Sequence, residues 1–247
     1  MLSSMKSYGQ FCGLARAAEV LGERWSLIIL RDLLVGSKRF NELRQGNPGI
    51  PSNLLTTRLR ELEAAGILER SIDGRSVVYR LSDYGSDLGP VLIELGRWGS
   101  RRMSEAREGE IPTDSSLAAA LLTSRTEAKV RAFNVEVTAG PAVAHAEVSE
   151  SGVNVAEGTD PTAQLFISGP GLRGLLADGD AEAAVAAGTV SVDGDESLLT
   201  VFVRAFRAPL DDSVGNAARE KWAPMAPAVR EPRGGSSGRV HSLVDPR

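Results

Sequence analysis

The chain has 247 residues, of which 42% are hydrophobic, and a formal net charge of −4. This content allows one large or two modest cores and excludes a wholly disordered chain, and no apolar run reaches the roughly 20 residues of a membrane-spanning helix. Cys12 is the only cysteine, which excludes an internal disulfide and any metal site built from several cysteines. His145 and His241 are the only histidines, which argues against a histidine-based metal site or triad.

The charge is divided unevenly along the chain. Residues 1–107 hold 16 Lys and Arg against 12 Asp and Glu, a net +4, whereas residues 108–247 hold 12 against 20, a net −8. A basic first part and an acidic second part predict two domains with different partners. The opening residues, MLSSMKSYGQ, lack the apolar region of a signal peptide, so we expect a cytoplasmic protein with no membrane partner.

Apolar periodicity and helix-stop signals predict the elements of the first part. Helices are expected over residues 8–21, 23–35, 39–43, 52–65 and 83–105. Pro90 is placed either to bend the last of these or to start its second half. Between the last two helices, ILERSI and SVVYRL flank Asp73-Gly74, which is a strong signal for a β-hairpin.

The stretch REGEIPTDSS, residues 107–116, predicts a polar linker. After it the pattern predicts a helix, four alternating strands in an antiparallel meander, two short helices, a strand and a closing apolar helix. The composition then turns to Pro, Gly, Ser and Arg, as in disordered tails. We therefore predict an α+β chain with domains at 1–107 and 115–210 and a disordered tail at 224–247.

The helix predicted over residues 52–65 has two different faces. At 100° per residue, its leucines and Ala65 share one side, and the opposite side carries Asn53, Thr56, Thr57, Arg60 and Ala64. Short hydrogen-bonding side chains, threonine methyls and an arginine are the residue types that read base edges in a major groove. They crowd into the first turns, which is the end of a recognition helix that enters the groove.

The hairpin predicts a second DNA contact, because Arg75 at its tip suits a narrow, negative minor groove. The alternative is that the helix and the hairpin are ordinary surface. The order helix, helix, turn, helix, hairpin favours a winged helix-turn-helix. Arg58 falls inside the apolar arc, so it either pairs with an acid such as Asp32 or Glu61, or extends to a phosphate.

The blocks ERWSLIILRDLLVGSKRFNELRQGNPGIPSNLLTTRLRELEAAGILERS, VVYRLSDYG and PVLIELGRWG resemble the HxlR branch of MarR-like winged-helix transcription factors, over roughly residues 10–103. The resemblance implies a DNA-binding homodimer, formed largely by the first and last helices of this domain, that acts on inverted-repeat operators. A repressor is favoured, although the family also contains activators.

The resemblance also implies site residues. Asn53, Thr56 and Thr57 fall on base-facing positions, Lys38 and Arg39 lie where the preceding helix meets the DNA backbone, and Arg75 is at the wing tip. Arg60 and Ser52 complete the expected DNA-binding set. Members usually begin the recognition helix with Ser before Pro, whereas this chain has Pro51-Ser52, which puts the role of Ser52 in doubt.

Cys12 matches a position near the first helix that in some members senses oxidants through a disulfide between subunits. The alternative is a small apolar residue in the dimer interface.

The second part resembles a sterol-carrier-protein-type-2-like domain over about residues 115–208, through the block AQLFISGPGLRGLLADGDAEAAVAAGTVSVDGDESLLTVFVRAF. That fold implies an apolar cavity for a hydrophobic effector. The residues expected to line the cavity are Phe133, Val135, Leu165, Ile167, Leu172, Leu175, Leu176, Leu199, Phe202 and Phe206. The alternative is that the same residues fill a solid core, since an apolar stripe is more often core than pocket.

No nucleophile and base occur in a catalytic pattern, so we expect no enzyme, cofactor or metal site. Gly169 to Gly174 fit G-x-G-x-x-G, but the short helix that follows does not suit a dinucleotide-binding unit. Two hypotheses remain. One is a dimeric DNA-binding regulator, and the other is a lipid or small-molecule carrier whose winged helix is only an interaction module.

Overall fold

The computed structural model describes residues 7–211, and the tail predicted at 224–247 lies outside them. The described residues form a mixed α+β structure with two separate clusters of buried apolar side chains. We call residues 7–103 the winged-helix part and residues 114–211 the sheet part. Both belong to one compact unit, and the predicted division into independent domains stays a prediction.

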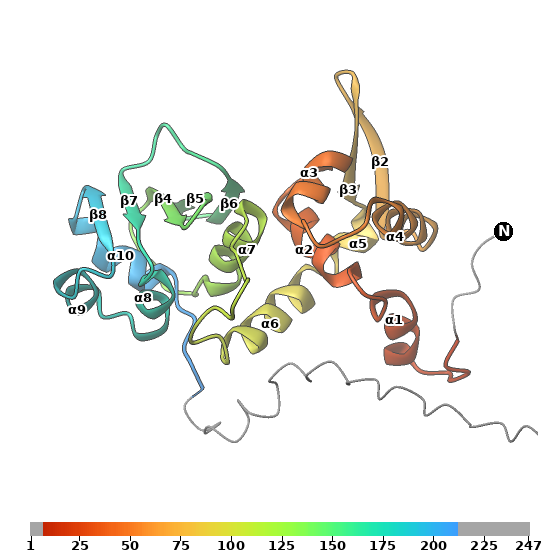
Figure 1. Cartoon of the computed structure of the whole chain (residues 1–247), viewed down its shortest axis with the longest axis horizontal. Helices are drawn as coiled ribbons and strands as arrows, with labels where there is room; N and C mark the ends of the chain where they lie inside the picture. The colour runs from red at the N-terminus through yellow and green to blue at the C-terminus, as the bar shows by residue number, and fades with distance from the viewer. Residues whose placement is uncertain (1–6, 212–247) are drawn as a thin grey trace, which may run out of the picture. The chain divides into compact units, whose positions relative to one another are not determined.

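The winged-helix part follows the predicted order of elements. They are α1 (Gly13–Leu21), α2 (Ser26–Val35), β1 (Lys38–Arg39), α3 (Phe40–Gly46), α4 (Ser52–Ala64), β2 (Leu68–Asp73), β3 (Ser76–Leu81), α5 (Asp83–Ser86) and α6 (Gly89–Ser100). The strands pair antiparallel in the order β1-β3-β2. In Figure 1 the β2–β3 hairpin projects beyond the helices of this part, and α4 lies beside its base.

Several helix boundaries differ from the prediction, and the helix expected over residues 83–105 is divided into α5 and α6 and ends at Ser100. The helix expected from residue 8 begins only at Gly13. Pro90 lies in the first turn of α6, where its missing N–H has no intrahelical partner to lose, so it starts a helix rather than bending one.

The core of the winged-helix part fixes the rotation of α4. Leu55, Leu59 and Leu62 lie at i, i+4 and i+7 and are at most 1% exposed. Burying a leucine stabilises a fold by about 1.5–3 kcal/mol, so these three hold one face of α4 against the rest of the cluster. The opposite face of α4 is thereby directed away from the core.

The sheet part is built from α7 (Asp114–Ser124), β4 (Phe133–Ala139), β5 (Ala142–Ser149), β6 (Gly152–Glu157), β7 (Leu165–Ser168), α8 (Leu172–Asp178), α9 (Ala181–Ala186), β8 (Ser191–Gly194) and α10 (Ser197–Ala205). The predicted linker therefore ends earlier than expected, because Thr113 caps α7 and its hydroxyl accepts from the Ser116 N–H.

The sheet is mixed, and the predicted antiparallel meander is wrong at one strand. Its order is β6-β5-β4-β7-β8, and β7 pairs with β4 in parallel. The segment between β6 and β7 carries the chain from the edge of the sheet to the other side of β4. Alternation of apolar residues reports which face a side chain occupies, not which strand is its neighbour, so the sequence did not reveal this crossover.

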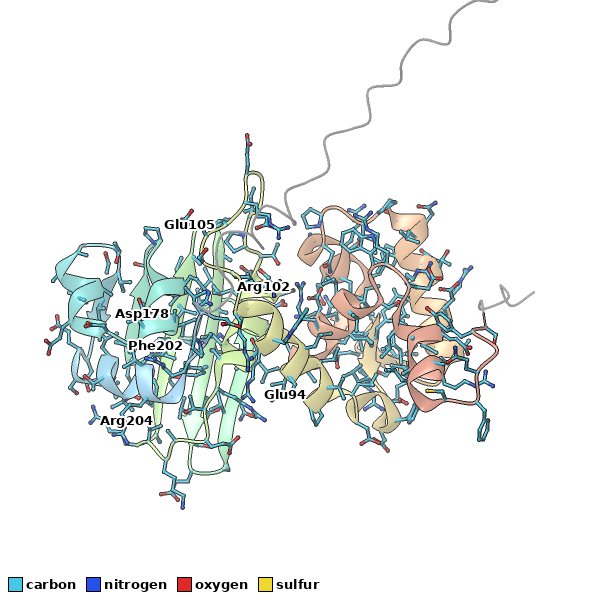
Figure 2. All side chains as sticks on the ribbon, turned by 90° about the horizontal axis from the view of Figure 1, so that it is seen from below. Glu94, Arg102, Glu105, Asp178, Phe202 and Arg204 are labelled. Atoms are coloured by element: carbon cyan, nitrogen blue, oxygen red, sulfur yellow. The ribbon has the colours of Figure 1, made fainter. Side chains whose placement is uncertain are left out.

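One face of this sheet and the helices α7, α8 and α10 enclose the second core. Figure 2 labels Phe202, which is 0% exposed and lies among the side chains between sheet and helices. Its ring centroid is 5.0 Å from that of Phe206. The other face of the sheet carries polar side chains such as Glu136, His145 and Glu147.

Candidate nucleic-acid interface

The face of α4 that points away from the core carries the predicted base-reading residues. Asn53, Thr57 and Arg60 are exposed, and Thr56 is half-buried. None of these four side chains is acidic, and the acids on either side of them, Glu61 and Glu63, are paired with Arg58 and Arg70, so we call the four the acid-free face. Within residues 7–211, Arg60 has no ion-pair partner. A rigid helix therefore presents amide, hydroxyl, methyl and guanidinium groups together to the outside.

Both threonine hydroxyls already donate to the helix backbone. Thr56 Oγ1 donates to the Ser52 carbonyl at 2.9 Å, and Thr57 Oγ1 donates to the Asn53 carbonyl at 3.0 Å. Each hydroxyl oxygen retains lone pairs that can accept a hydrogen bond. In this arrangement the threonines suit base edges with amino donors, or the methyl group of thymine.

Ser52 is the first residue of α4 and Pro51 occupies the N-cap position. No side chain caps the helix there, so Ser52 does not perform the capping role of a serine placed before the helix. Its side chain is exposed at the end of α4 that would enter a groove.

The β2–β3 hairpin is the wing, and its turn lies one residue later than predicted. Asp73 pairs with Ser76, which leaves Gly74 and Arg75 as the two loop residues. Gly74 has φ +60°, whereas Arg75 is not among the described residues with positive φ. This is the type II′ pattern, in which glycine takes the first loop position and matches the twist of the strands.

Arg75 differs from the other arginines of the wing. Arg70 Nε lies 2.7 Å from Glu63 Oε1, and Arg80 Nη2 lies 2.6 Å from Glu69 Oε1. Arg75 is exposed and forms no ion pair within the described part of the chain. The tip therefore presents an uncompensated positive charge.

Lys38 lies at the start of the helix-turn-helix, as predicted, but its side chain is paired within the protein. It is 9% exposed, and its Nζ is 2.5 Å from Glu157 Oε2 in β6, so in this conformation its charge is compensated inside the protein. The neighbouring Arg39 is exposed, and its backbone N–H donates to Glu42 Oε2 at 2.6 Å, which fixes the start of α3. Of the predicted backbone-binding pair, the structure leaves only Arg39 accessible.

Arg58 pairs with acids and does not reach outwards. Its guanidinium binds Glu61 and lies 3.0 Å from Glu23 Oε2. Asp32, the other predicted partner, is engaged elsewhere. Arg58 Nε is buried without a hydrogen-bond partner.

A buried carboxylate ties the turn of the helix-turn-helix to α2. Asp32 is 0% exposed. Its Oδ1 accepts from Arg31 Nε and Nη2 at 2.8 and 2.6 Å, and its Oδ2 accepts from Asn47 Nδ2 at 2.5 Å. Asn47 directly follows α3, and its Nδ2 also donates to the Leu43 carbonyl. The pair Asp32 and Asn47 thereby holds the turn that leads into α4.

The burial of the Asp32 carboxyl makes a pH-dependent contribution to stability, opposite in sign to the effect of its partners Arg31 and Asn47. Burial raises the pKa of Asp32 above its ordinary value of 3.8, against the lowering effect of Arg31. A carboxyl whose pKa is higher in the folded than in the unfolded state binds more protons when folded. Its contribution is thus complete below pH 3.8 and is lost as the pH rises through the raised pKa.

A comparison of the wild type with Asp32→Asn tests this contribution. The free energy of unfolding of the wild type, minus that of Asp32→Asn, should fall as the pH rises from about 3.8 through the raised pKa. Urea unfolding at a series of pH values measures it, and the subtraction removes the titration of the other carboxyls. A difference that rises with pH would mean that Arg31 and Asn47 outweigh burial.

Cys12 is exposed and lies at the N-cap position of α1. Arg16, one turn further on, directs its guanidinium to Glu19 at 3.2 Å. A redox role for Cys12 stays a prediction.

The ten residues expected to line an apolar cavity all belong to the buried cluster of the sheet part. Burial is expected both of a filled core and of the wall of an enclosed cavity, so the two alternatives both stay predictions. A cavity of about 350 Å³ lies on the polar face of the sheet. It is lined by Asn134, His145, Glu147, Asn154, Val155, Ala156, Asp160 and Thr162, none of which was predicted.

Among residues 7–211, no helix is long and apolar enough to cross a membrane. The same residues contain no group of three or more His, Cys, Asp or Glu arranged to hold a metal ion.

A family model described as HxlR-like helix-turn-helix matches residues 20–107. In Bacillus subtilis (strain 168), the uncharacterized HTH-type transcriptional regulator YdeP is 33% identical over 108 residues, which cover 40% of this chain and 84% of YdeP. The uncharacterized HTH-type transcriptional regulator YybR from the same organism is 36% identical over 91 residues, which cover 36% of this chain and 73% of YybR.

Among solved structures, quinone-bound YodB from B. subtilis is 35% identical, with a TM-score of 0.33. The match covers 36% of this chain and 96% of YodB. The family model ends at Arg107, before the sheet part begins, so the likeness of the sheet part to sterol carriers stays a prediction.

Proposed function

This chain belongs to the HxlR family of helix-turn-helix transcriptional regulators, and we propose that it is a homodimer that binds an inverted-repeat operator in a sequence-specific manner. The observation that carries the proposal is the acid-free face of α4, which its buried leucines direct away from the core, together with the uncompensated Arg75 at the tip of the wing.

In the proposed complex, the N-terminal turns of α4 enter the major groove. There Asn53, Thr56 and Thr57 contact base edges, since amide and hydroxyl groups at this end of a recognition helix reach the bases. Arg60 lies further along the same face and Arg75 enters the adjacent minor groove. Arg39, at the start of α3, contacts a phosphate, because the first helix of a helix-turn-helix crosses the DNA backbone.

The two copies associate through the exposed apolar side chains of α1 and α6. Phe11 and Leu14 are 107% and 79% exposed at α1, and Trp98 is 62% exposed on α6. Side chains of this size are normally covered when they occur in groups. A symmetric dimer places its two recognition helices about one helical turn of DNA apart, 10–10.5 base pairs.

Two substitutions separate positioning from sequence reading. Arg75→Ala is expected to weaken binding to all DNA sequences and to reduce the salt slope of log K by about 0.9 per chain, which is about 1.8 for the proposed dimer. Thr57→Ala is expected to keep the salt slope and to lose about 1–3 kcal/mol of discrimination at one base pair. Fluorescence anisotropy against the preferred and the singly substituted operator, across a salt series, measures both.

The control for this pair is Arg80→Ala, because Arg80 lies on the same hairpin but is already paired with Glu69. It should change the salt slope less than Arg75→Ala. An Arg75→Ala protein with unchanged affinity and slope would remove the wing from the proposed contact.

Repression is the favoured sign of regulation, since an operator covered by a dimer is closed to other proteins. A hydrophobic effector would bind in the sheet part among the buried residues around Phe202, either in an enclosed cavity or by opening a filled core. The carrier hypothesis requires binding at the same place and gives no role to the acid-free face of α4.

A further inference from the structure

The pairing of Lys38 with Glu157 connects the two parts of the protein at the DNA-binding surface. The side chains of Lys38 and Glu157 are 11% and 24% exposed, with Nζ and Oε2 2.5 Å apart. The second carboxylate oxygen of Glu157 accepts from the hydroxyl of Ser115, which is itself 4% exposed. Glu157 is thus held in place by both a hydrogen bond and an ion pair.

Lys38 starts the segment that leads into the helix-turn-helix. It forms β1 with Arg39, pairs with Tyr79 of the wing strand β3, and is followed directly by α3. The N-terminus of the first helix of a helix-turn-helix lies at the DNA backbone. A lysine at this point has the charge and the position to contact a phosphate, but the sheet part occupies it.

We propose that Glu157, although it lies in the sheet part, determines the affinity of the DNA-binding surface by withholding Lys38 from the DNA backbone. The inference rests on the proposed DNA binding. Glu157 acts through Lys38 and does not itself touch DNA, so it lowers the number of phosphate contacts by one per chain.

The physical reason is the cost of leaving an ammonium group without a partner in a nearly buried place. When a substitution removes the charge of Glu157, Lys38 remains charged and is destabilised in its nearly buried position, because no partner offsets its lost hydration. Its flexible four-carbon stem allows it to extend into water. Asp32 does not replace Glu157, because it is 0% exposed and its oxygens accept from Arg31 and Asn47.

The test uses four full-length variants and the salt dependence of DNA affinity. Glu157→Gln retains the shape of the side chain and an oxygen for Ser115, but removes the charge. Glu147→Gln is the matched control, since it makes the same change in net charge at an exposed residue of the neighbouring strand. Lys38→Met and the double variant Lys38→Met with Glu157→Gln complete the set.

Each freed lysine that reaches a phosphate steepens the slope of log K against log salt by about 0.9. The increase in DNA affinity from 200 to 50 mM salt is then about threefold larger than without that contact. Glu157→Gln is expected to show this gain per chain relative to Glu147→Gln. Lys38→Met is expected to leave the wild-type slope unchanged, and the double variant is expected to lose the gain.

Three results would overturn the inference while leaving the proposed function intact. They are equal slopes for Glu157→Gln and Glu147→Gln, a flatter slope for Lys38→Met alone, or a gain that persists in the double variant. If thermal melting shows Glu157→Gln to be misfolded, Lys38→Met decides alone, because its slope must equal that of the wild type. A wild-type protein that binds no DNA would remove both proposals together.

Discussion

Replacing Trp98 by glutamate is expected to convert the proposed dimer into a monomer of 26.2 kDa and to weaken binding to an inverted-repeat operator by about 100-fold or more. The second figure follows from avidity, because two linked recognition helices bind 10²–10⁴-fold more tightly than one. The monomer is expected because a carboxylate buried in an apolar interface loses its hydration and gains no partner, which destabilises the dimer.

The structure indicates which face of α6 is available to a second copy. Val91, Leu95 and Trp98 lie at i, i+4 and i+7 and are 58%, 41% and 62% exposed. The other side of α6 is occupied by α7, where a Cβ added at Gly96 would lie 2.6 Å from the side chain of Thr123.

The sheet part also holds α6 in place. Arg97 Nε and Nη2 donate to the carbonyls of Thr123 and Arg125 at 2.9 and 2.7 Å. Arg173 Nη2 donates to the carbonyl of Ser100, the last residue of the helix, at 2.8 Å. The apolar face is therefore presented by a helix that is fixed at its C-terminal end.

Sedimentation equilibrium measures the mass, and anisotropy measures the affinity of the same samples. Trp98→Phe is the matched control and is expected to remain dimeric, because it retains an aromatic ring without adding charge. A Trp98→Glu protein that is still dimeric at micromolar concentration would show that α6 is not the interface.

The second large effect concerns the core of the sheet part. Phe202→Ala is expected to lower the free energy of unfolding by about 3–5 kcal/mol, the range for removing a buried aromatic ring and leaving a cavity. Phe202 is 0% exposed and its ring contacts Phe206, so the truncated site loses partners on several sides.

This experiment also separates the two interpretations of the ten apolar residues. In a solid core the truncation costs the full amount. In the wall of an open cavity it costs much less, because fewer contacts are lost and no new void is formed. Urea unfolding followed by circular dichroism measures the change, with Val185→Ala, at a 45% exposed residue, as the near-neutral control.

The elements that the sequence predicted well are those set by local signals. Helix α4 was predicted to within a residue, because Leu55, Leu59 and Leu62 repeat at the helical period and Gly66 follows. The wing was predicted from Asp73-Gly74, but its turn lies one residue later, since both Asp-Gly and Gly-X pairs form two-residue hairpin loops.

The features that were missed depend on partners far away in the chain. The resemblance implied a DNA contact for Lys38, and nothing in the sequence indicated that Glu157, held by Ser115, would pair with it. The parallel pairing of β7 with β4 was missed for the same reason. Phe133 and Phe202 are buried, which both the predicted cavity and the alternative core require, and periodicity does not distinguish the wall of a cavity from a filled core.

The proposed function requires sequence-specific binding of DNA by a dimer, and a selection from random double-stranded DNA examines this property without any assumption about the operator. The purified full-length protein is incubated with the library at moderate salt, and the recovered sequences are then titrated by anisotropy. We expect an inverted repeat whose half-sites lie 10–10.5 base pairs apart, bound by two chains and at least about 10³-fold more tightly than scrambled DNA. Recovery of no common sequence, with equal and weak binding to every duplex at low salt, would contradict it.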